Sequence, residues 1–380
     1  METAGLPGTA DPGTENTSPS RPVAGTVPAA PAPSAPGSRP VPSPLPVPPG
    51  RALDCITFGR ANMDLYTDPG LSIEETPGFT KSIGGSPANI AVAMARLGMR
   101  VGMITRAADD PVGHFVVRSL RELGVDTSQI VFDSTGASTS VAFAETRSGG
   151  SNTVLYRNNA ADLLINPAEI DEGYLASSAM LLVSGTALSV SPSRDAAMLA
   201  MGIARKAGTL VALDIDYRPY SWRSPETASV ALMLAAESCD VVIGTREEFD
   251  ALEAVYGNSG TSGVERDAAT AQRLLAGGTA VVVVKRGKDG STAYTATGDR
   301  VHGPVFPVVP AKVYGAGDAF AGAFLSRLLR GASLEDALTA GAANASINIS
   351  KTRCAEDMAT WEEITSYIKE NADALSRTTP

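Results

Sequence analysis

One short run of glycines with a single carboxylate carries the pattern best suited to chemistry. Gly315, Ala316, Gly317 and Asp318 lie where an extended apolar run, 305–313, gives way to a helix of small residues. Backbone amides at a helix N-terminus bind anions. A carboxylate in that turn opposes anion binding unless it takes a proton from a hydroxyl that attacks a phosphoryl group. The run therefore predicts phosphoryl transfer with Asp318 as the base, and an N-capping aspartate after a glycine turn is the alternative.

Two earlier stretches contain residue types that bind hydroxyl groups. Asp64 follows a predicted buried strand at 54–59, and a side chain at the C-terminal end of such a strand points into the crevice where ligands bind. Gly84 and Gly85 allow a polyol to approach the backbone closely, and Asn89 both donates and accepts hydrogen bonds. A turn-forming aspartate and a plain helix cap are the structural alternatives.

Two arginines indicate an acidic ligand. Arg157 ends a predicted strand, and Arg218 follows another, at 209–213. Guanidinium groups recognise planar carboxylates with two parallel hydrogen bonds, so this pair is suited to clamping the acidic end of a sugar. A neutral hexose would need no such pair. An internal salt bridge is the alternative for each arginine.

Composition excludes several classes of function. Residues 1–50 hold more than half of the 26 prolines and almost no large apolar residue, which predicts a disordered tail followed by one domain over 51–380. A net charge of −10 without a basic stripe argues against nucleic-acid binding. No apolar run approaches the roughly 20 residues that cross a membrane. Three widely spaced cysteines and no secretory signal favour a cytoplasmic protein.

The predicted elements define a fold class. Strands alternate with helices over 54–352, which predicts an α/β fold with a doubly wound, mostly parallel sheet flanked by helices. Segments 65–82 and 138–157 are expected to form a small inserted β-sheet that acts as a lid over the site. The chain contains neither a Walker A sequence nor the protein-kinase motifs.

Two segments of this chain, 83–98 and 312–325, resemble the two signatures of the ribokinase-like carbohydrate kinases of phosphofructokinase B type. The resemblance covers essentially all of 54–352 and implies the ribokinase-like fold. It also implies that Asp318 is the catalytic base and that the amides of Ala316, Gly317 and Asp318 form the anion hole. In that family an aspartate at the place of Asp64 holds two sugar hydroxyls. The chain departs from the family at Tyr314, where a threonine is usual.

The resemblance further implies ATP and Mg²⁺ as cofactors, since nucleotide phosphates enter such sites as metal complexes. Glu247 stands where family members carry a glutamate that organises the metal, but Gly244 replaces the accompanying asparagine. A capping charge is the alternative for Glu247. Residues expected beside the nucleotide are Lys285, Gly287, Gly290 and Asn344. An ordinary solvated lysine is the alternative for Lys285.

The lid arginine and the run 213–222 resemble the sugar-acid branch of the family. This implies phosphorylation of 5-dehydro-2-deoxy-D-gluconate to its 6-phosphate in inositol catabolism, with 2-keto-3-deoxygluconate and fructose as alternative substrates. Related kinases often dimerise through the lid, so a homodimer is expected. The alternative of a different class is a sugar-acid-binding protein that has lost catalysis. The retained Asp318 and its two glycines count against that alternative.

Overall fold

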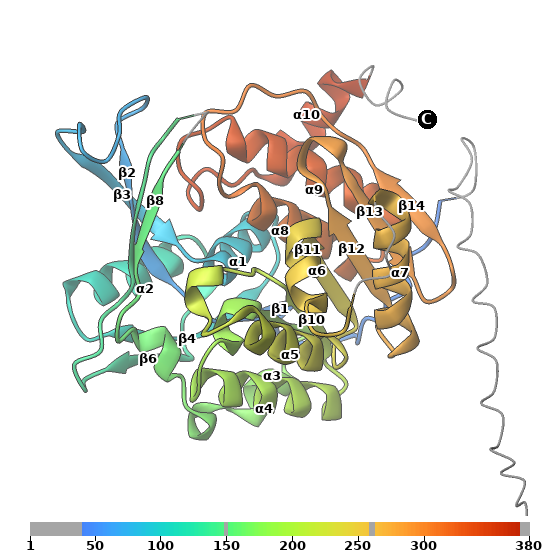
Figure 1. Cartoon of the computed structure of the whole chain (residues 1–380), viewed down its shortest axis with the longest axis horizontal. Helices are drawn as coiled ribbons and strands as arrows, with labels where there is room; N and C mark the ends of the chain where they lie inside the picture. Colours follow the sequence, from blue (N-terminus) through green and yellow to red (C-terminus); the bar gives the residue numbers. More distant parts are fainter. Residues whose placement is uncertain (1–39, 148–150, 258–262, 373–380) are drawn as a thin grey trace, which may run out of the picture. The chain divides into compact units, whose positions relative to one another are not determined.

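The computed structural model describes residues 40–147, 151–257 and 263–372. Its central feature is a sheet whose strands run in the order β14-β13-β12-β11-β10-β9-β1-β4-β5, with β6 also paired to β4 (Figure 1). The strands are β1 (Cys55–Phe58), β4 (Val101–Ala108), β5 (Val125–Asp126), β6 (Ile130–Asp133), β9 (Met180–Ser184), β10 (Leu210–Asp214), β11 (Val241–Thr245), β12 (Val281–Lys285), β13 (Ser291–Thr295) and β14 (Arg300–Gly303). Among the described residues, the antiparallel pairings in this sheet are those of β13 with β12 and with β14. The predicted α/β, mostly parallel sheet is confirmed.

The strands form because short runs of β-branched and other apolar residues bury both of their faces. In β12, Val281 and Val283 belong to one hydrophobic cluster, whereas Val282 and Val284 belong to another on the opposite face. Successive side chains of a strand point to opposite faces, so one continuous apolar run supplies two cores. The sheet is therefore covered on both sides.

Helices form the outer layers (Figure 1). The face with Val281 is covered by α1 (Ser86–Arg96), α2 (Pro111–Glu122), α8 (Ala316–Leu329) and α9 (Leu334–Ile349), and α10 (Trp361–Glu370) packs on α9. The face with Val282 is covered by α3 (Glu172–Ala176), α4 (Ser193–Lys206), α5 (Pro225–Ala236), α6 (Arg246–Glu253) and α7 (Gly263–Ala276). Parallel neighbours place the C-terminal ends of β10, β11 and β12 along one edge. That edge is where an open α/β sheet binds its ligands.

A second, smaller sheet has the strand order β3-β2-β7-β8. Its strands are β2 (Asn62–Thr67), β3 (Phe79–Gly84), β7 (Val141–Ala144) and β8 (Thr153–Tyr156). It projects from the main sheet in Figure 1 and is built from the two segments that the sequence predicts as a lid. The prediction placed its edges at 65–82 and 138–157, close to the observed strand bounds.

Residues 40–50 do not behave as the predicted disordered tail. Leu45 is only 7% exposed and belongs to the main core cluster. The amide of Val41 donates to the carboxylate of Glu335 at 3.0 Å, and the carbonyl of Val41 accepts from the amide of Leu334 at 2.9 Å. Val41 and Val47 also pack against that cluster, so apolar contacts together with these two hydrogen bonds dock the segment. The rest of the predicted tail, 1–39, lies outside the described residues.

No helix in the described part of the chain is long and apolar enough to span a membrane.

Candidate active site

The glycine-rich run lies at the start of α8. Gly315 is the N-cap and has φ 88°, the left-handed region that favours glycine. A Cβ on Gly315 would lie 2.6 Å from Cys354 Sγ and 2.7 Å from Asn348 Oδ1, so no larger residue fits there. The first-turn amides of a helix have no acceptor within the helix. Those of Ala316, Gly317 and Asp318 are therefore available to an anion, as the sequence predicts.

Asp318 is held by two side chains of α1. Its Oδ1 accepts from Ser86 Oγ at 2.8 Å, and its Oδ2 accepts from Asn89 Nδ2 at 2.7 Å. Burial, together with the charges of Asp214 and Asp216, raises the pKa of Asp318 to about 6. A carboxylate with a pKa near neutrality is well matched to general-base catalysis.

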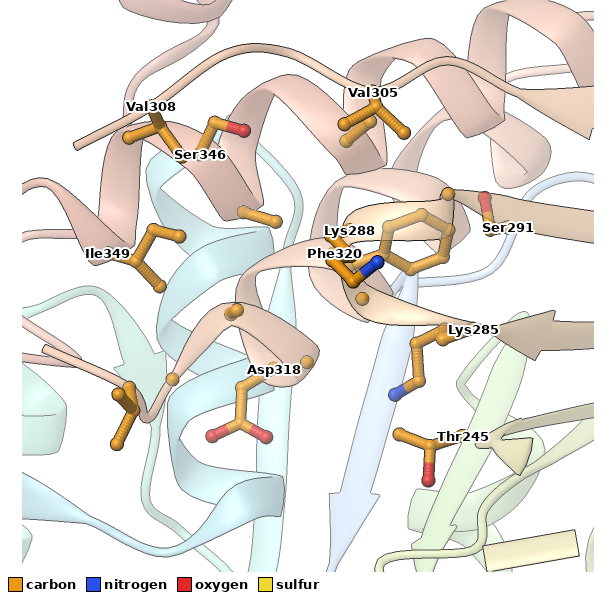
Figure 2. A pocket seen from close by; sticks show the side chains of 18 of the residues that line it. Thr245, Lys285, Lys288, Ser291, Val305, Val308, Asp318, Phe320, Ser346 and Ile349 are labelled. Atoms are coloured by element: carbon orange, nitrogen blue, oxygen red, sulfur yellow. The ribbon is translucent and has the colours of Figure 1, made fainter. Parts of the chain in front are cut away.

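Lys285, at the end of β12, places a positive charge against the same helix start. Its Nζ lies 3.7 Å from Asp214 Oδ1 and would lie 3.3 Å from a Cβ on Gly317. Burial alone would lower the pKa of Lys285, but the charges of Asp214, Glu248 and Asp318 outweigh it and raise the pKa. The side chains of Asp318 and Lys285 point toward the same part of the cavity in Figure 2. A charged lysine there is suited to a phosphate group.

Two further carboxylates complete a buried charged cluster. Glu248, in the first turn of α6, has its pKa raised to about 7 by burial, against the opposing effect of Lys285. Asp216 adopts φ 35°, accepts from Ser184 Oγ at 2.9 Å and pairs with Arg218 Nη2 at 2.9 Å. Strained backbone and perturbed pKa values of this kind concentrate at functional sites.

These groups line one cavity of about 770 Å³. Its polar side holds Asp214, Glu248, Lys285 and Asp318, and Arg218 lies on its wall with a side chain that is 45% exposed. The other side is apolar (Figure 2) and includes Val305, Val308, Phe320, Ala342, Ala345 and Ile349. Gly287 and Gly290, which the sequence predicts beside the nucleotide, also line the cavity. A cavity of this size with one apolar and one charged side fits a nucleotide.

Of the residues predicted to bind hydroxyls, Asn89 contacts Asp318, and Gly84 and Gly85 lie where β3 leads into α1. Asp64 accepts from Asn62 Nδ2 at 2.5 Å and from Tyr66 Oη at 2.7 Å, and burial raises its pKa. A Cβ on Gly84 would overlap the Asp64 carboxylate, so the glycine makes room for it. Gly85 has φ 98° and caps α1.

Two amide oxygens in this region have no hydrogen-bond partner among the described residues. They are Asn62 Oδ1 and Asn89 Oδ1, and both are buried. A buried acceptor without a partner is costly, so such atoms indicate where a ligand hydroxyl would donate.

Arg157 is engaged within the protein. Its Nη2 pairs with Asp162 Oδ2 at 2.5 Å, its Nε donates to the same oxygen at 3.1 Å, and its side chain is 8% exposed. Arg218 lines the cavity, whereas Arg157 is not among its lining residues, and each arginine is paired with an aspartate. The two ion pairs are connected through Thr186, whose carbonyl accepts from Arg157 and whose hydroxyl donates to Asp216.

At two predicted positions, Glu247 and Asn344, a neighbouring residue of the same helix faces the cavity instead. Glu247 is exposed and does not line the cavity, whereas its neighbour Glu248 does, because a helix turns about 100° per residue. Asn344 is fully buried, donates to the Ala319 carbonyl at 2.8 Å and accepts from the Ala359 amide at 3.3 Å. It ties α9 to α8, and its neighbours Ala342 and Ala345 face the cavity.

Sequence reasoning missed Ser86, Asp214 and Glu248. Ser86 Oγ lies 2.8 Å from Asp318 and 2.9 Å from Asp214 Oδ2, so it joins the two carboxylates. Asp214 ends a buried strand, the same signal that identified Asp64. For Glu248 the sequence shows only two adjacent glutamates, and the cap geometry of α6 decides between them.

Curated relatives align with most of this chain. A curated relative from Geobacillus kaustophilus (strain HTA426), described as 5-dehydro-2-deoxygluconokinase, is 45% identical over 329 residues, which is 86% of this chain and 97% of the relative. One from Shouchella clausii (strain KSM-K16) with the same description is 45% identical over 84% of this chain and 97% of its own length.

Among solved structures, a fructokinase with bound ATP from Xylella fastidiosa superimposes with a TM-score of 0.74 and 27% identity, covering 84% of this chain and 99% of its own. A PfkB protein from Polaromonas sp. JS666 does so with a TM-score of 0.69 and 29% identity, over 81% and 99% of the two chains. The sequence pattern of the pfkB family carbohydrate kinases matches residues 52–361. The chain therefore belongs to the pfkB family of carbohydrate kinases.

Proposed function

We propose that this kinase transfers the γ-phosphoryl group of ATP to the 6-hydroxyl of 5-dehydro-2-deoxy-D-gluconate. The observation that carries the proposal is the meeting of Asp318, the open amides of α8 and Lys285 at one end of a nucleotide-sized cavity. The printed name shared by relatives about 45% identical over most of the chain supports the substrate. The product would enter inositol catabolism.

The chemical step follows from the site. Asp318 accepts the proton of the sugar hydroxyl as its oxygen attacks the γ-phosphorus, and the bond from that phosphorus to the bridging oxygen of ADP breaks. The amides of Ala316, Gly317 and Asp318, with Lys285, stabilise the charge on the transferred group. The products are the sugar phosphate and ADP, and the proton leaves through Asp318.

On the sugar, Asp64 and Asn89 hold hydroxyl groups beside Gly84 and Gly85. Arg218 is the arginine that lines the cavity, and we assign it to the sugar carboxylate. Arg157 supports this site indirectly, by joining the end of the lid strand β8 to Asp162.

Magnesium fits the charged cluster. The described residues contain no group of three or more carboxylate, histidine or cysteine ligands that could hold a metal alone. Mg²⁺ keeps several waters and binds nucleotide phosphates plus one or two carboxylates, so a complete protein cage is not needed. Asp214 Oδ1 is buried without a hydrogen bond, and Glu248 is close enough to Asp214 for the aspartate's charge to raise the pKa of the glutamate. These two carboxylates would hold the ion, which neutralises phosphate charge when bound.

We further propose a homodimer formed through the small sheet. Phe79, Val154 and Tyr156 are 39%, 41% and 60% exposed, and Phe143 packs edge-on against both Phe79 and Tyr156. An aromatic cluster exposed on one sheet is typical of a surface that binds a second protein. A second copy of this chain is the occupant we assign. The three buried free thiols support a cytoplasmic location.

The test is ATP consumption with 5-dehydro-2-deoxygluconate, 2-keto-3-deoxygluconate, fructose and ribose, repeated for Arg218→Ala and Arg157→Ala. Fructose is included because a solved fructokinase shares this fold. We expect preference for an acid, a raised KM for that acid in Arg218→Ala, and lower thermal stability in Arg157→Ala, since removing one partner leaves a buried charge. Preference for a neutral sugar with Arg218→Ala unaffected would overturn the substrate. If ATP is consumed with none of the four sugars, a sugar-binding protein without catalysis is favoured.

A further inference from the structure

Lys312 is a fully buried lysine in the segment that leads into α8. Its Nζ donates to Asn348 Oδ1 at 2.7 Å, to the Asn348 carbonyl at 2.8 Å and to the Tyr314 carbonyl at 3.2 Å. Lysines are almost never fully buried unless paired, because transferring an ammonium out of water is costly. The proposed chemistry makes no use of this residue.

The partners of Lys312 are neutral oxygens. Its ammonium has three protons and meets three acceptors, so each proton is used. No carboxylate lies within salt-bridge distance of it among the described residues. Burial lowers the pKa of Lys312, while the carboxylates of Asp357 and Asp318 oppose that effect. Lys312 therefore acts as a single positive charge enclosed by carbonyl dipoles.

Those acceptors belong to two elements that meet at the anion hole. Asn348 lies in the last turn of α9, where carbonyls lack helical partners and the helix dipole favours a cation. The amide of Ala311 also binds this helix end, donating to the Ile349 carbonyl at 2.8 Å. Tyr314 immediately precedes Gly315, and a Cβ on Gly315 would lie only 3.4 Å from Lys312 Nζ. The ammonium thus fastens the start of α8 to the end of α9.

We propose that Lys312 is a positioning residue for phosphoryl transfer, an internal cation that fixes the Tyr314–Gly315 turn and so aims the α8 amides and Asp318 at the γ-phosphoryl group. The inference rests on the proposed function and deepens it. Preorganised donors stabilise a transition state only when their geometry is held before reaction. Lys312 also lies 5.5 Å from the Tyr314 ring centroid, and that ring stacks on Tyr66 of the lid sheet at 5.3 Å. One charge therefore orders both the anion hole and its contact with the lid.

The primary experiment compares Lys312→Met with Lys351→Met. Methionine has nearly the length of lysine without its charge, and Lys351 is a nearby lysine that makes only a peripheral ion pair with Glu363. We expect kcat of Lys312→Met to fall about 100-fold, as when donors are misplaced by about 1 Å, with KM for the sugar changed less than about threefold. Lys351→Met should match the unmodified enzyme. A wild-type kcat in Lys312→Met would overturn the proposal.

Chemical rescue separates a missing charge from general damage. In Lys312→Ala the three oxygens would surround an empty space, so added NH₄⁺ or K⁺ should restore kcat in a saturable manner, whereas tetramethylammonium is too large and should not. Loss of kcat without any rescue, accompanied by a proportionate loss of folded protein, would assign Lys312 to stability alone and overturn the proposal.

Two measurements remain decisive if a variant does not fold or if no sugar is phosphorylated. The unmodified enzyme should have the same kcat in tetramethylammonium, Na⁺ and K⁺ buffers, because its cation is built in. Saturable activation by K⁺ would contradict this. Calorimetric binding of a non-hydrolysable ATP analogue should be about tenfold weaker in Lys312→Met than in Lys351→Met, and this readout needs no sugar turnover. Equal binding in the two variants would contradict the inference even if the sugar assignment failed.

Discussion

At the scale of single residues, the site places buried carboxylates and a lysine close together. Ser86 has one proton but lies within hydrogen-bond distance of both Asp214 and Asp318. Only one carboxylate can accept that proton at a time, so the two are coupled, and burial raises the pKa of both. Lys285 offsets part of this repulsion. Repulsion among these buried carboxylates therefore destabilises the ionised form of Asp318 and raises its pKa.

Asp318→Asn should lower kcat by several orders of magnitude while sparing sugar binding, because the amide cannot take a proton. In the unmodified enzyme, kcat/KM should fall as pH drops below about 6, where Asp318 becomes protonated. Steady-state kinetics against pH checks both. If Asp318→Asn turns over at a near-normal rate, or if its kcat/KM still falls below about pH 6, Asp318 is not the base.

The same shift predicts a change in stability. The pKa of Asp318 is higher in the folded chain than its ordinary value of 3.8, so folding binds a proton and stability falls as pH rises from about 4 through about 6. Asp318→Asn should therefore melt a few degrees higher than the unmodified protein at pH 8, with a smaller difference at pH 4. Thermal melts at both pH values test the sign.

Adjacent glutamates give a matched pair for the metal assignment. Glu248→Gln should raise the Mg²⁺ concentration for half-maximal activity by about tenfold or more, because it removes a buried carboxylate from the phosphate side of the cavity. Glu247→Gln alters an exposed carboxylate and should change little. Magnesium titrations of ATP consumption check the pair. Equal responses of the two variants would refute the assignment.

At the scale of elements, loops and helix ends build the site on a rigid sheet. The ends of β10 and β12 supply Asp214 and Lys285, and the starts of α1, α6 and α8 supply Ser86, Glu248 and Asp318. In a parallel sheet these ends converge at one edge. The small sheet contributes Asp64 from β2 and carries the exposed aromatic cluster. The proposed sugar site and the proposed dimer interface therefore share this small sheet.

Tyr156→Asp should convert a lid-mediated dimer to a monomer, because it places a charge in an apolar contact. Leu234→Asp, at a 50% exposed position on α5, is the control and should leave the mass unchanged. Sedimentation or light scattering measures the outcome. A monomeric unmodified protein, or a Tyr156→Asp variant that remains dimeric, would contradict the lid interface.

At the scale of the whole molecule, the described chain forms one unit whose core extends to both faces of the large sheet. Residues 40–50 belong to it, since Leu45 is buried in the core and Val41 bonds to Glu335 and Leu334. The packed part of the described chain therefore begins before Arg51, the start that composition indicates.

A chain that starts at Pro40 should be as stable as the full-length protein, whereas one that starts at Arg51 should lose about 2 kcal/mol, since it exposes the site of one buried leucine. Denaturant unfolding measures this, and Leu45→Ala in the full chain should show a similar loss. If the two truncated chains are equally stable, residues 40–50 do not contribute to the stability of the domain.

The sequence by itself determined the alternation of strands and helices, the glycine–aspartate start of α8 and the paired glycines before α1, because these depend on local periodicity and backbone freedom. Comparison with relatives then placed the chain in its family. Arg157, Glu247 and Asn344 show what local patterns could not decide. Each has a residue type suited to ligand binding, yet one pairs with Asp162, one faces solvent and one joins two helices.

The tertiary structure alone decided the charged cluster and the surroundings of Lys312. Asp214, Glu248 and Lys285 come from three strand or helix ends that meet only when the sheet forms. Lys312 looks like an ordinary lysine in the sequence, and its environment comes from Asn348, which is contributed by the following helix. Side-chain direction and long-range pairing set pKa values, metal preference and orientation, and neither is encoded in local spacing.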